Sequence, residues 1–66
     1  MQETKDVDAR WRAALDGLTL PERESVVLRA QNLTLREIAD ILQIRPRRVA
    51  ALLVRASARL KQVLDA

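Results

Sequence analysis

Apolar residues recur every three or four positions along most of the chain, which is the period of an α-helix with one buried face. The first such segment is predicted to be helical from about Asp6 to Asp16. Its apolar stripe consists of Val7, Trp11, Ala14, Leu15 and Leu18. We expect Trp11 to anchor the core against the last helix. Gly17 stands where a helix often ends in a left-handed residue.

A short motif then occurs twice, first as Leu-Thr-Leu-Pro-Glu at 18–22 and again as Leu-Thr-Leu-Arg-Glu at 33–37. Each copy contains Thr-x-x-Glu, the capping box that satisfies free amides at the start of a helix. The motifs predict a second helix from Leu20 to about Gln31 and a short third helix from Leu35 to Leu42. The second helix is expected to bury Val26, Val27 and Ala30 or nearby positions. The apolar residues of the third helix are Ile38, Ala39, Ile41 and Leu42.

A tight turn at Gln43 and Ile44 is predicted to lead into a fourth helix, which begins at Pro46 and ends at about Leu64. Its core face is predicted to carry Val49, Leu53, Ala56, Leu60 and Val63. Its opposite face is predicted to carry Arg48, Ala51, Arg55 and Arg59, with Leu52 at the edge and Val54 on the other flank. The fold class is therefore all-α: one small four-helix domain over residues 1–66, with a helix-turn-helix and a long C-terminal recognition helix. We expect residues 1–5 to be a flexible tail.

The composition narrows the possible functions. The 66 residues include no cysteine and no histidine, so disulfides and the usual zinc sites are excluded. The carboxylates are interpreted as helix caps and surface charges, so we predict no enzyme, no catalytic residue, no metal and no cofactor. No apolar run is long enough to cross a membrane. We expect no membrane partner and a cytoplasmic location.

The charge distribution gives the first indication of a partner. The net charge is +3, and six basic residues lie between Arg45 and Lys61 with no acidic residue among them. Three of them, Arg45, Arg47 and Arg48, crowd the positive end of the fourth helix, where each cation costs about 0.3–1 kcal/mol. A sequence selected for stability alone would avoid this arrangement. We therefore favour a phosphate-binding turn over a merely solvated basic turn.

Ala51, Leu52 and Val54 leave two interpretations open. Leu52 either flanks the core or meets a ligand, and Val54 is either a scattered surface residue or a contact. As contacts, these residues would touch thymine methyl groups or a protein partner. The candidate DNA-binding residues are Arg45, Arg47, Arg48, Ala51, Leu52, Arg55 and Arg59, and the candidate partner contacts are Leu52 and Val54.

From Leu18 to Leu60 the chain resembles the helix-turn-helix shared by sigma factor region four and LuxR-type regulators. The matching positions are Leu18-Thr19, Glu22-Arg23-Glu24, Leu28, Ala30-Gln31, Leu33-Thr34, Glu37-Ile38-Ala39, Leu42, Ile44, Val49 and Leu60. Arg55-Ala56 followed by Arg59-Leu60-Lys61 resembles the ending of region four. The resemblance implies binding to double-stranded promoter DNA of the −35 type and to the RNA polymerase flap.

Two alternatives accompany this interpretation. The first is a LuxR-type DNA-binding domain, although such domains usually carry a further dimerising helix after a break beyond the position of Leu60. The second is a protein-interaction module that binds RNA polymerase or an anti-sigma partner through Leu52 and Val54. It is suggested by Ala50, Ala51 and Leu52, which stand where the family usually places polar residues. The resemblance therefore does not imply ordinary base readout through these three.

Overall fold

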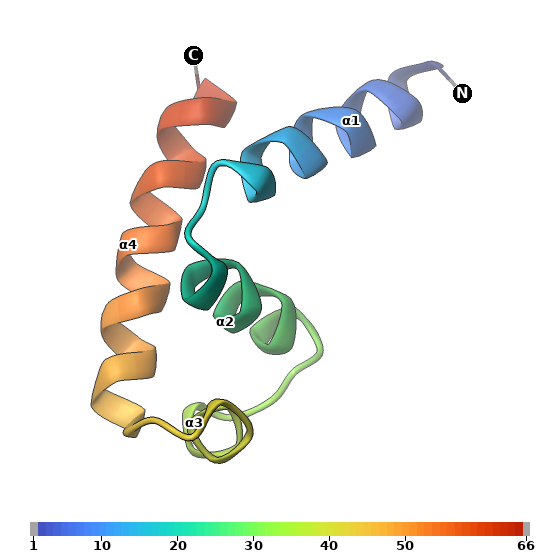
Figure 1. Cartoon of the computed structure of the whole chain (residues 1–66). Coiled ribbons are helices and arrows are strands. Elements are labelled where there is room, and N and C mark those ends of the chain that lie inside the picture. The colour runs from blue at the N-terminus through green and yellow to red at the C-terminus, as the bar shows by residue number, and fades with distance from the viewer. Residues whose placement is uncertain (1, 66) are drawn as a thin grey trace.

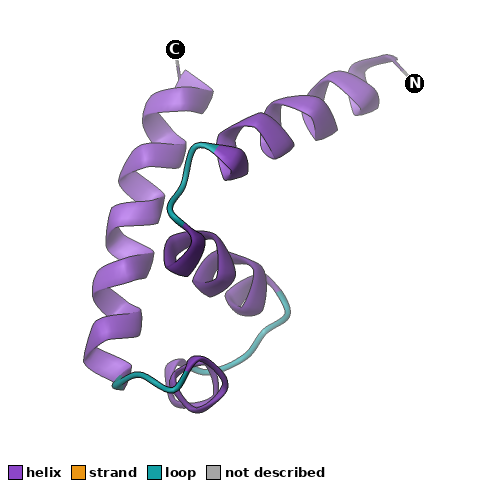
Figure 2. Ribbon diagram, in the orientation of Figure 1, coloured by secondary structure: helices purple, strands orange, loops and turns teal. Residues whose placement is uncertain are grey.

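The computed structural model describes the backbone of residues 2–65 and the side chains of residues 9–63 and 65. Over this range the chain forms four helices and no strand: α1 (Gln2–Asp16), α2 (Leu20–Ala30), α3 (Leu35–Leu42) and α4 (Pro46–Asp65). Figure 1 shows α4 along one side of the molecule, with α1, α2 and α3 following one another beside it, and each of them contacts α4. Short loops join the helices (Figure 2). The predicted all-α fold with four helices is confirmed.

The helix bounds agree closely with those predicted, except at the start of the chain. α1 begins at Gln2 rather than at about Asp6, so the backbone of residues 2–5 is helical where a flexible tail was expected. Residues 2–5 include neither glycine nor proline, and the expectation rested only on the lack of apolar residues. Met1 lies outside the described residues.

Both repeated motifs form complete capping boxes. At α2, the Thr19 amide donates to Glu22 Oε1 at 2.9 Å, and Thr19 Oγ1 accepts from the Glu22 amide at 3.4 Å. At α3, the Thr34 amide donates to Glu37 Oε1 at 2.9 Å, and Thr34 Oγ1 accepts from the Glu37 amide at 3.1 Å. These bonds occupy amides that have no partner inside the helix, which fixes where each helix begins.

A left-handed residue was predicted at Gly17, but the residues with left-handed backbone angles lie elsewhere. Gly17 does not have a positive φ, and its amide donates to the carbonyls of Ala13 and Ala14, both at 3.2 Å, as in a helical continuation. The positive φ angles belong instead to Asn32, at 67°, and Gln43, at 60°. Gln43 ends α3, and this left-handed residue turns the chain toward α4.

The core consists of two apolar clusters along α4. One joins the end of α1 to the C-terminal half of α4 through Ala14, Leu18, Ala56 and Leu60. The other joins α3 to the start of α4 through Ile38, Ala39 and Val49, with half-buried leucines and Ile44 around it. The second cluster fixes the angle between the two helices of the helix-turn-helix.

Val49, Ala56 and Leu60 are buried as predicted, but the core face of α4 is rotated slightly toward Leu52. Leu52 is buried, at 6% exposed, whereas Leu53 is half-buried and Val63 is 48% exposed. The periodic pattern alone does not distinguish these phases, because leucines occupy both 52 and 53. The rotation turns Val54 outward.

Other predicted core positions differ as well. On α2, Val26 is half-buried, whereas Val27 and Ala30 are exposed; the buried residues are Glu22 and Ser25. The Ser25 hydroxyl is satisfied by the Pro21 carbonyl at 2.9 Å. On α3, Ile41 was identified from the sequence only as apolar, and its side chain is 54% exposed.

Trp11 was expected in the core against α4, yet it is 43% exposed and lines a surface hollow with residues of α2. Val7 lies outside the described side chains. No described helix is long and apolar enough to cross a membrane.

Candidate nucleic-acid interface

The N-terminal end of α4 presents three arginines to solvent. Arg45, Arg47 and Arg48, called the turn arginines below, are all exposed, and the first turn of α4 contains no acidic residue. The Arg45 carbonyl accepts from the amides of Arg48 at 2.9 Å and Val49 at 3.2 Å, which starts the helix. Arg45 thus occupies the cap position, where Ser, Thr, Asp or Asn is preferred because its side chain accepts from a free amide. The predicted grouping of the three cations at one helix end is present.

The turn arginines surround a shallow surface hollow. It has a volume of about 450 Å³ and is lined by the turn arginines together with Ile44 and Ala51. Ile44 also packs against the cluster of Ile38, Ala39 and Val49, so the floor of the hollow is attached to the core. The hollow is therefore anchored to the core through Ile44. An anion bound in it could interact with several guanidinium groups at once.

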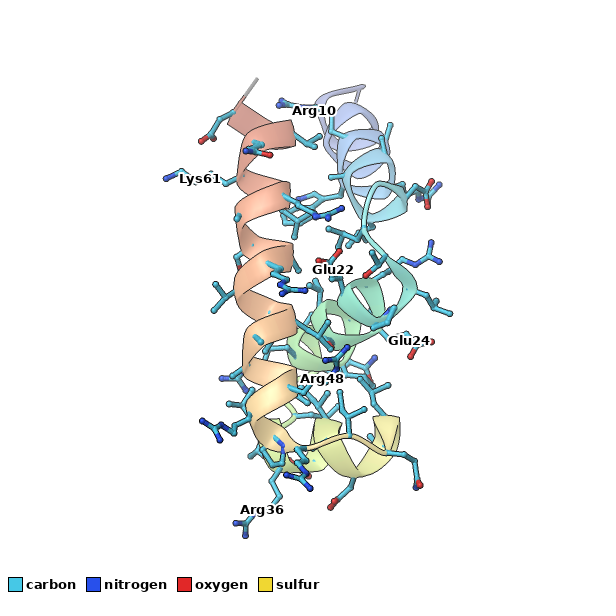
Figure 3. All side chains as sticks on the ribbon, turned by 60° about the vertical axis from the view of Figure 1, so that its left-hand side comes forward. Arg10, Glu22, Glu24, Arg36, Arg48 and Lys61 are labelled. Carbon is cyan, nitrogen blue, oxygen red and sulfur yellow. The ribbon has the colours of Figure 1, made fainter. Side chains whose placement is uncertain are left out.

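Arg36 belongs with this basic region, although the sequence interpretation did not select it. It lies in the first turn of α3 and is exposed, and Figure 3 shows its side chain projecting at the end of the molecule where α4 begins. The repeated motif contained the signal, since Arg36 stands where the first copy has Pro21. A second helix start, that of α3, thus carries a cation beside its positive end.

The outward face of α4 mixes cations with small apolar side chains. Ala51, Val54 and Arg55 are all exposed, and Val54 is 71% exposed. Leu52, proposed from the sequence as a contact, is buried, so the structure favours its interpretation as a core residue. We therefore leave Leu52 out of the interface.

Arg59 has a partner within the protein. Its Nε lies 3.7 Å from Oε2 of Glu22, whose side chain is only 3% exposed. Hydrogen bonding from the Thr19 backbone amide lowers the pKa of Glu22 most, and Arg59 and Arg55 lower it further, against the opposing effect of burial. Glu22 is therefore a carboxylate at neutral pH. It holds Arg59 at the junction of α2 and α4, away from the turn arginines.

A second surface is mainly apolar and is formed by α2 together with residues of α1 and α3. One hollow of about 490 Å³ is lined by Arg23, Glu24, Val27, Leu28, Ile41 and Leu42. A neighbouring hollow of similar size is lined by Trp11, Leu15, Val26, Val27, Ala30 and Gln31. Val27 belongs to both, and we call their combined lining the α2 surface. The sequence did not predict this surface, because Trp11, Leu15, Val26, Val27 and Ala30 in its lining were assigned to the core.

The described residues contain no group of histidine, cysteine, aspartate or glutamate side chains that could hold a metal ion.

The model of the family described as Sigma-70, region 4, matches residues 8–60. The chain belongs to the sigma-70 region 4 family. Comparisons with curated proteins and with solved structures found no match.

Sigma-70 region 4 is a transcription regulatory domain that binds DNA and RNA polymerase and is not an enzyme family. The family match confirms the predicted resemblance to sigma factor region four. It also confirms the predicted class of function, a helix-turn-helix domain that acts in transcription. The matched region includes the turn arginines, Arg36 and the α2 surface.

Proposed function

We propose that this region 4 domain binds promoter DNA of the −35 type by placing α4 in the major groove, while the α2 surface faces RNA polymerase. The observation that carries the DNA side of the proposal is the cluster of exposed turn arginines at the uncapped start of α4. An α-helix fits the width of the major groove, and recognition helices insert by their N-terminal residues. The basic end of α4 is the end that would meet the duplex.

In this arrangement the turn arginines bind phosphates beside the groove. Arg36, at the start of α3, adds a further phosphate contact, and Arg55 extends the basic edge along α4. Ala51 and Val54 face the bases. Phosphate contacts set the position of the domain on the duplex without selecting a sequence.

The α2 surface supports the polymerase side. Trp11, Val27 and Ile41 are exposed apolar side chains that line neighbouring hollows. Large apolar side chains gathered around hollows are typical of protein contact sites. The surface lies on helices other than α4, so DNA and protein need not compete for the same residues. An anti-sigma protein is the alternative occupant.

The DNA contact is tested by the salt dependence of binding. Each phosphate that a cation neutralises adds about 0.9 to the slope of log affinity against log salt. Replacing the three turn arginines by glutamine should lower the slope by up to roughly three units and weaken binding to all duplexes alike. Fluorescence anisotropy over a salt series measures both quantities.

A matched control comes from α1. Arg12 is an exposed arginine on a helix that lies outside the helix-turn-helix, and Arg12→Gln makes the same change of charge as Arg47→Gln. Arg47→Gln should lower the slope and Arg12→Gln should leave it unchanged. Equal slopes for the wild type and the triple variant would exclude the turn arginines from the DNA contact.

The second candidate is a protein-interaction module with little DNA binding, which the α2 surface favours. It predicts weak duplex binding whose slope does not depend on the turn arginines. Binding to the polymerase flap would then be lost with Ile41→Asp and retained with the triple glutamine variant.

A further inference from the structure

Val54 is an apolar side chain on the face of α4 that is directed away from the core. At 71% exposed it is the most exposed of the large apolar side chains among the described residues. It therefore contributes little to folding, and any polar residue would suit the position in an isolated domain. Its preceding neighbours on the same face are Ala51 and Arg47, three and seven positions earlier.

The surroundings of Val54 are cationic. Arg47, Arg48 and Arg55 lie on the outward face or its edge and are exposed, and no acidic residue occurs between Arg45 and Lys61. This charge complements a polyanion, and a single valine within it is too small a patch for an apolar protein surface. In the proposed complex, Val54 therefore faces the floor of the major groove.

The length of α4 allows Val54 to lie over the bases while the turn arginines lie beside phosphates. Seven residues of α-helix rise about 10.5 Å, so Val54 lies that far along α4 from Arg47. Base pairs are spaced about 3.4 Å apart, so the rise from Arg47 to Val54 is comparable in length to about three base-pair steps. Ala51, between the two, has a side chain short enough for the helix to approach the base edges closely.

Thymine is the base whose major-groove edge carries an apolar group, its C5-methyl. Resting on the proposed DNA binding, we propose that Val54, assisted by the close approach that Ala51 permits, reads thymine methyl groups in the major groove. The specificity of the domain then comes partly from apolar contact, because Ala51 and Val54 have no side-chain hydrogen-bonding groups. The ligand class is a duplex with thymine at one or two positions near the phosphates held by the turn arginines.

The experiment begins with selection of preferred sites from a random duplex library by the full chain. In the selected duplex, each thymine is then replaced singly by deoxyuridine, which removes the methyl group and keeps base pairing. One or two replacements should weaken binding roughly fourfold, which is about 0.8 kcal/mol for one methyl-sized group. Val54→Ala should weaken binding to the thymine duplex by a similar factor. Deoxyuridine at those positions should then have little further effect on the variant.

Val63→Ala is the matched control, because Val63 is also an exposed valine of α4 but lies near its C-terminal end, on the core side of the helix. It should leave affinity and thymine dependence unchanged. Val54→Thr keeps the side-chain shape and one methyl group, and it should retain part of the thymine dependence. Circular dichroism of each variant verifies that it is folded.

The outcomes separate this inference from the proposed function. Salt-dependent duplex binding that is insensitive to every deoxyuridine replacement, or to Val54→Ala, overturns the role of Val54 and leaves the DNA-binding function intact. A selection that returns no preferred thymine also overturns it. Absence of salt-dependent duplex binding by the wild type overturns the proposed function, and the inference with it.

Discussion

The carboxylate of Glu22 connects the start of α2 to the middle of α4. Its Oε1 caps α2 by accepting from the Thr19 amide at 2.9 Å, and its Oε2 lies 3.7 Å from Nε of Arg59. Figure 3 shows Glu22 in the region between the two helices. One carboxylate thus both caps the start of α2 and forms an ion pair with a residue of α4. Its counterpart Glu37 caps α3 in the same way but is exposed.

The two capping glutamates predict a pH dependence of stability. Hydrogen bonding from the cap threonine amides lowers the pKa of Glu22 and of Glu37 below the ordinary 4.5. A carboxyl whose pKa is lowered by folding stabilises the protein fully above its unfolded pKa, and that stabilisation is lost as the pH falls through the folded-state pKa. The free energy of unfolding should therefore be level above about pH 5.5 and fall as the pH drops below 4.5. Urea melts across this range measure it.

Comparing glutamine substitutions at Glu22 and Glu37 separates the effect of the cap from that of the ion pair with Arg59. Glutamine can still accept the cap hydrogen bond but carries no charge, so Glu37→Gln should lose only the pH-dependent part of the stability that Glu37 contributes. Glu22→Gln should destabilise more at neutral pH, because it also removes the charge that faces Arg59. The difference between Glu22→Gln and the wild type should narrow at low pH, where Glu22 becomes protonated. Equal effects of the two variants at every pH would contradict the role assigned to Arg59.

Two substitutions at helix ends, Gly17→Ala and Gln43→Gly, should each stabilise the domain. Gly17 lacks a positive φ, and an added Cβ would lie 3.4 Å from the Ala14 carbonyl oxygen, an ordinary contact. Gly17→Ala should therefore raise stability by about 0.4–1 kcal/mol through loss of unfolded-state freedom. Gln43 has a φ of 60°, so Gln43→Gly should relieve left-handed strain and also stabilise. Thermal melts of both variants should shift upward; a downward shift of either would contradict the φ angle assigned there.

Much of the fold follows from local sequence signals. The two Thr-x-x-Glu motifs predicted the starts of α2 and α3 because capping is decided within four residues, and Pro46 marked α4 for the same kind of reason. The rotation of α4 did not follow, because adjacent Leu52 and Leu53 satisfy the apolar period equally well. Only the positions of the other helices decide which of them is buried.

Core truncations should rank with observed burial. Ile38 is fully buried in the cluster that joins α3 to α4, so Ile38→Ala should cost about 2–5 kcal/mol. Leu53→Ala, at a half-buried position in the same cluster, should cost less. Val54→Ala should remain within about 0.5 kcal/mol of the wild type, as surface substitutions usually do. Chemical denaturation gives the order; a larger loss for Val54 than for Leu53 would contradict the orientation of α4.

The candidate interface was predictable in part. Charge order along the sequence located the turn arginines, since three cations at a helix start oppose the helix dipole whatever the tertiary structure. The ion pair of Arg59 was not predictable, because Glu22 is distant in sequence and meets Arg59 only when α2 packs on α4. Exposure of Trp11 and Ile41 likewise depends on tertiary packing, and amphipathic periodicity assigns such residues to the core by default.

Replacing the turn arginines by glutamine should stabilise the folded domain while it weakens DNA binding. Each arginine lies at the positive end of α4, and cations there cost about 0.3–1 kcal/mol at low ionic strength. The triple variant should gain about 1 kcal/mol or more, which raises the melting temperature of a domain this size by about 4–8 °C per kcal/mol.

The salt dependence of stability distinguishes an electrostatic gain in the triple glutamine variant from a change in packing. The turn arginines are exposed, so the gain should shrink at high salt, where exposed charges are screened. The corresponding triple glutamate variant should be more stable still at low salt, because anions favour a helix N-terminus. A melting temperature that falls in the glutamine variant would show that the arginines support the fold. Higher stability with weaker duplex binding would instead identify them as residues retained for DNA at a cost to folding.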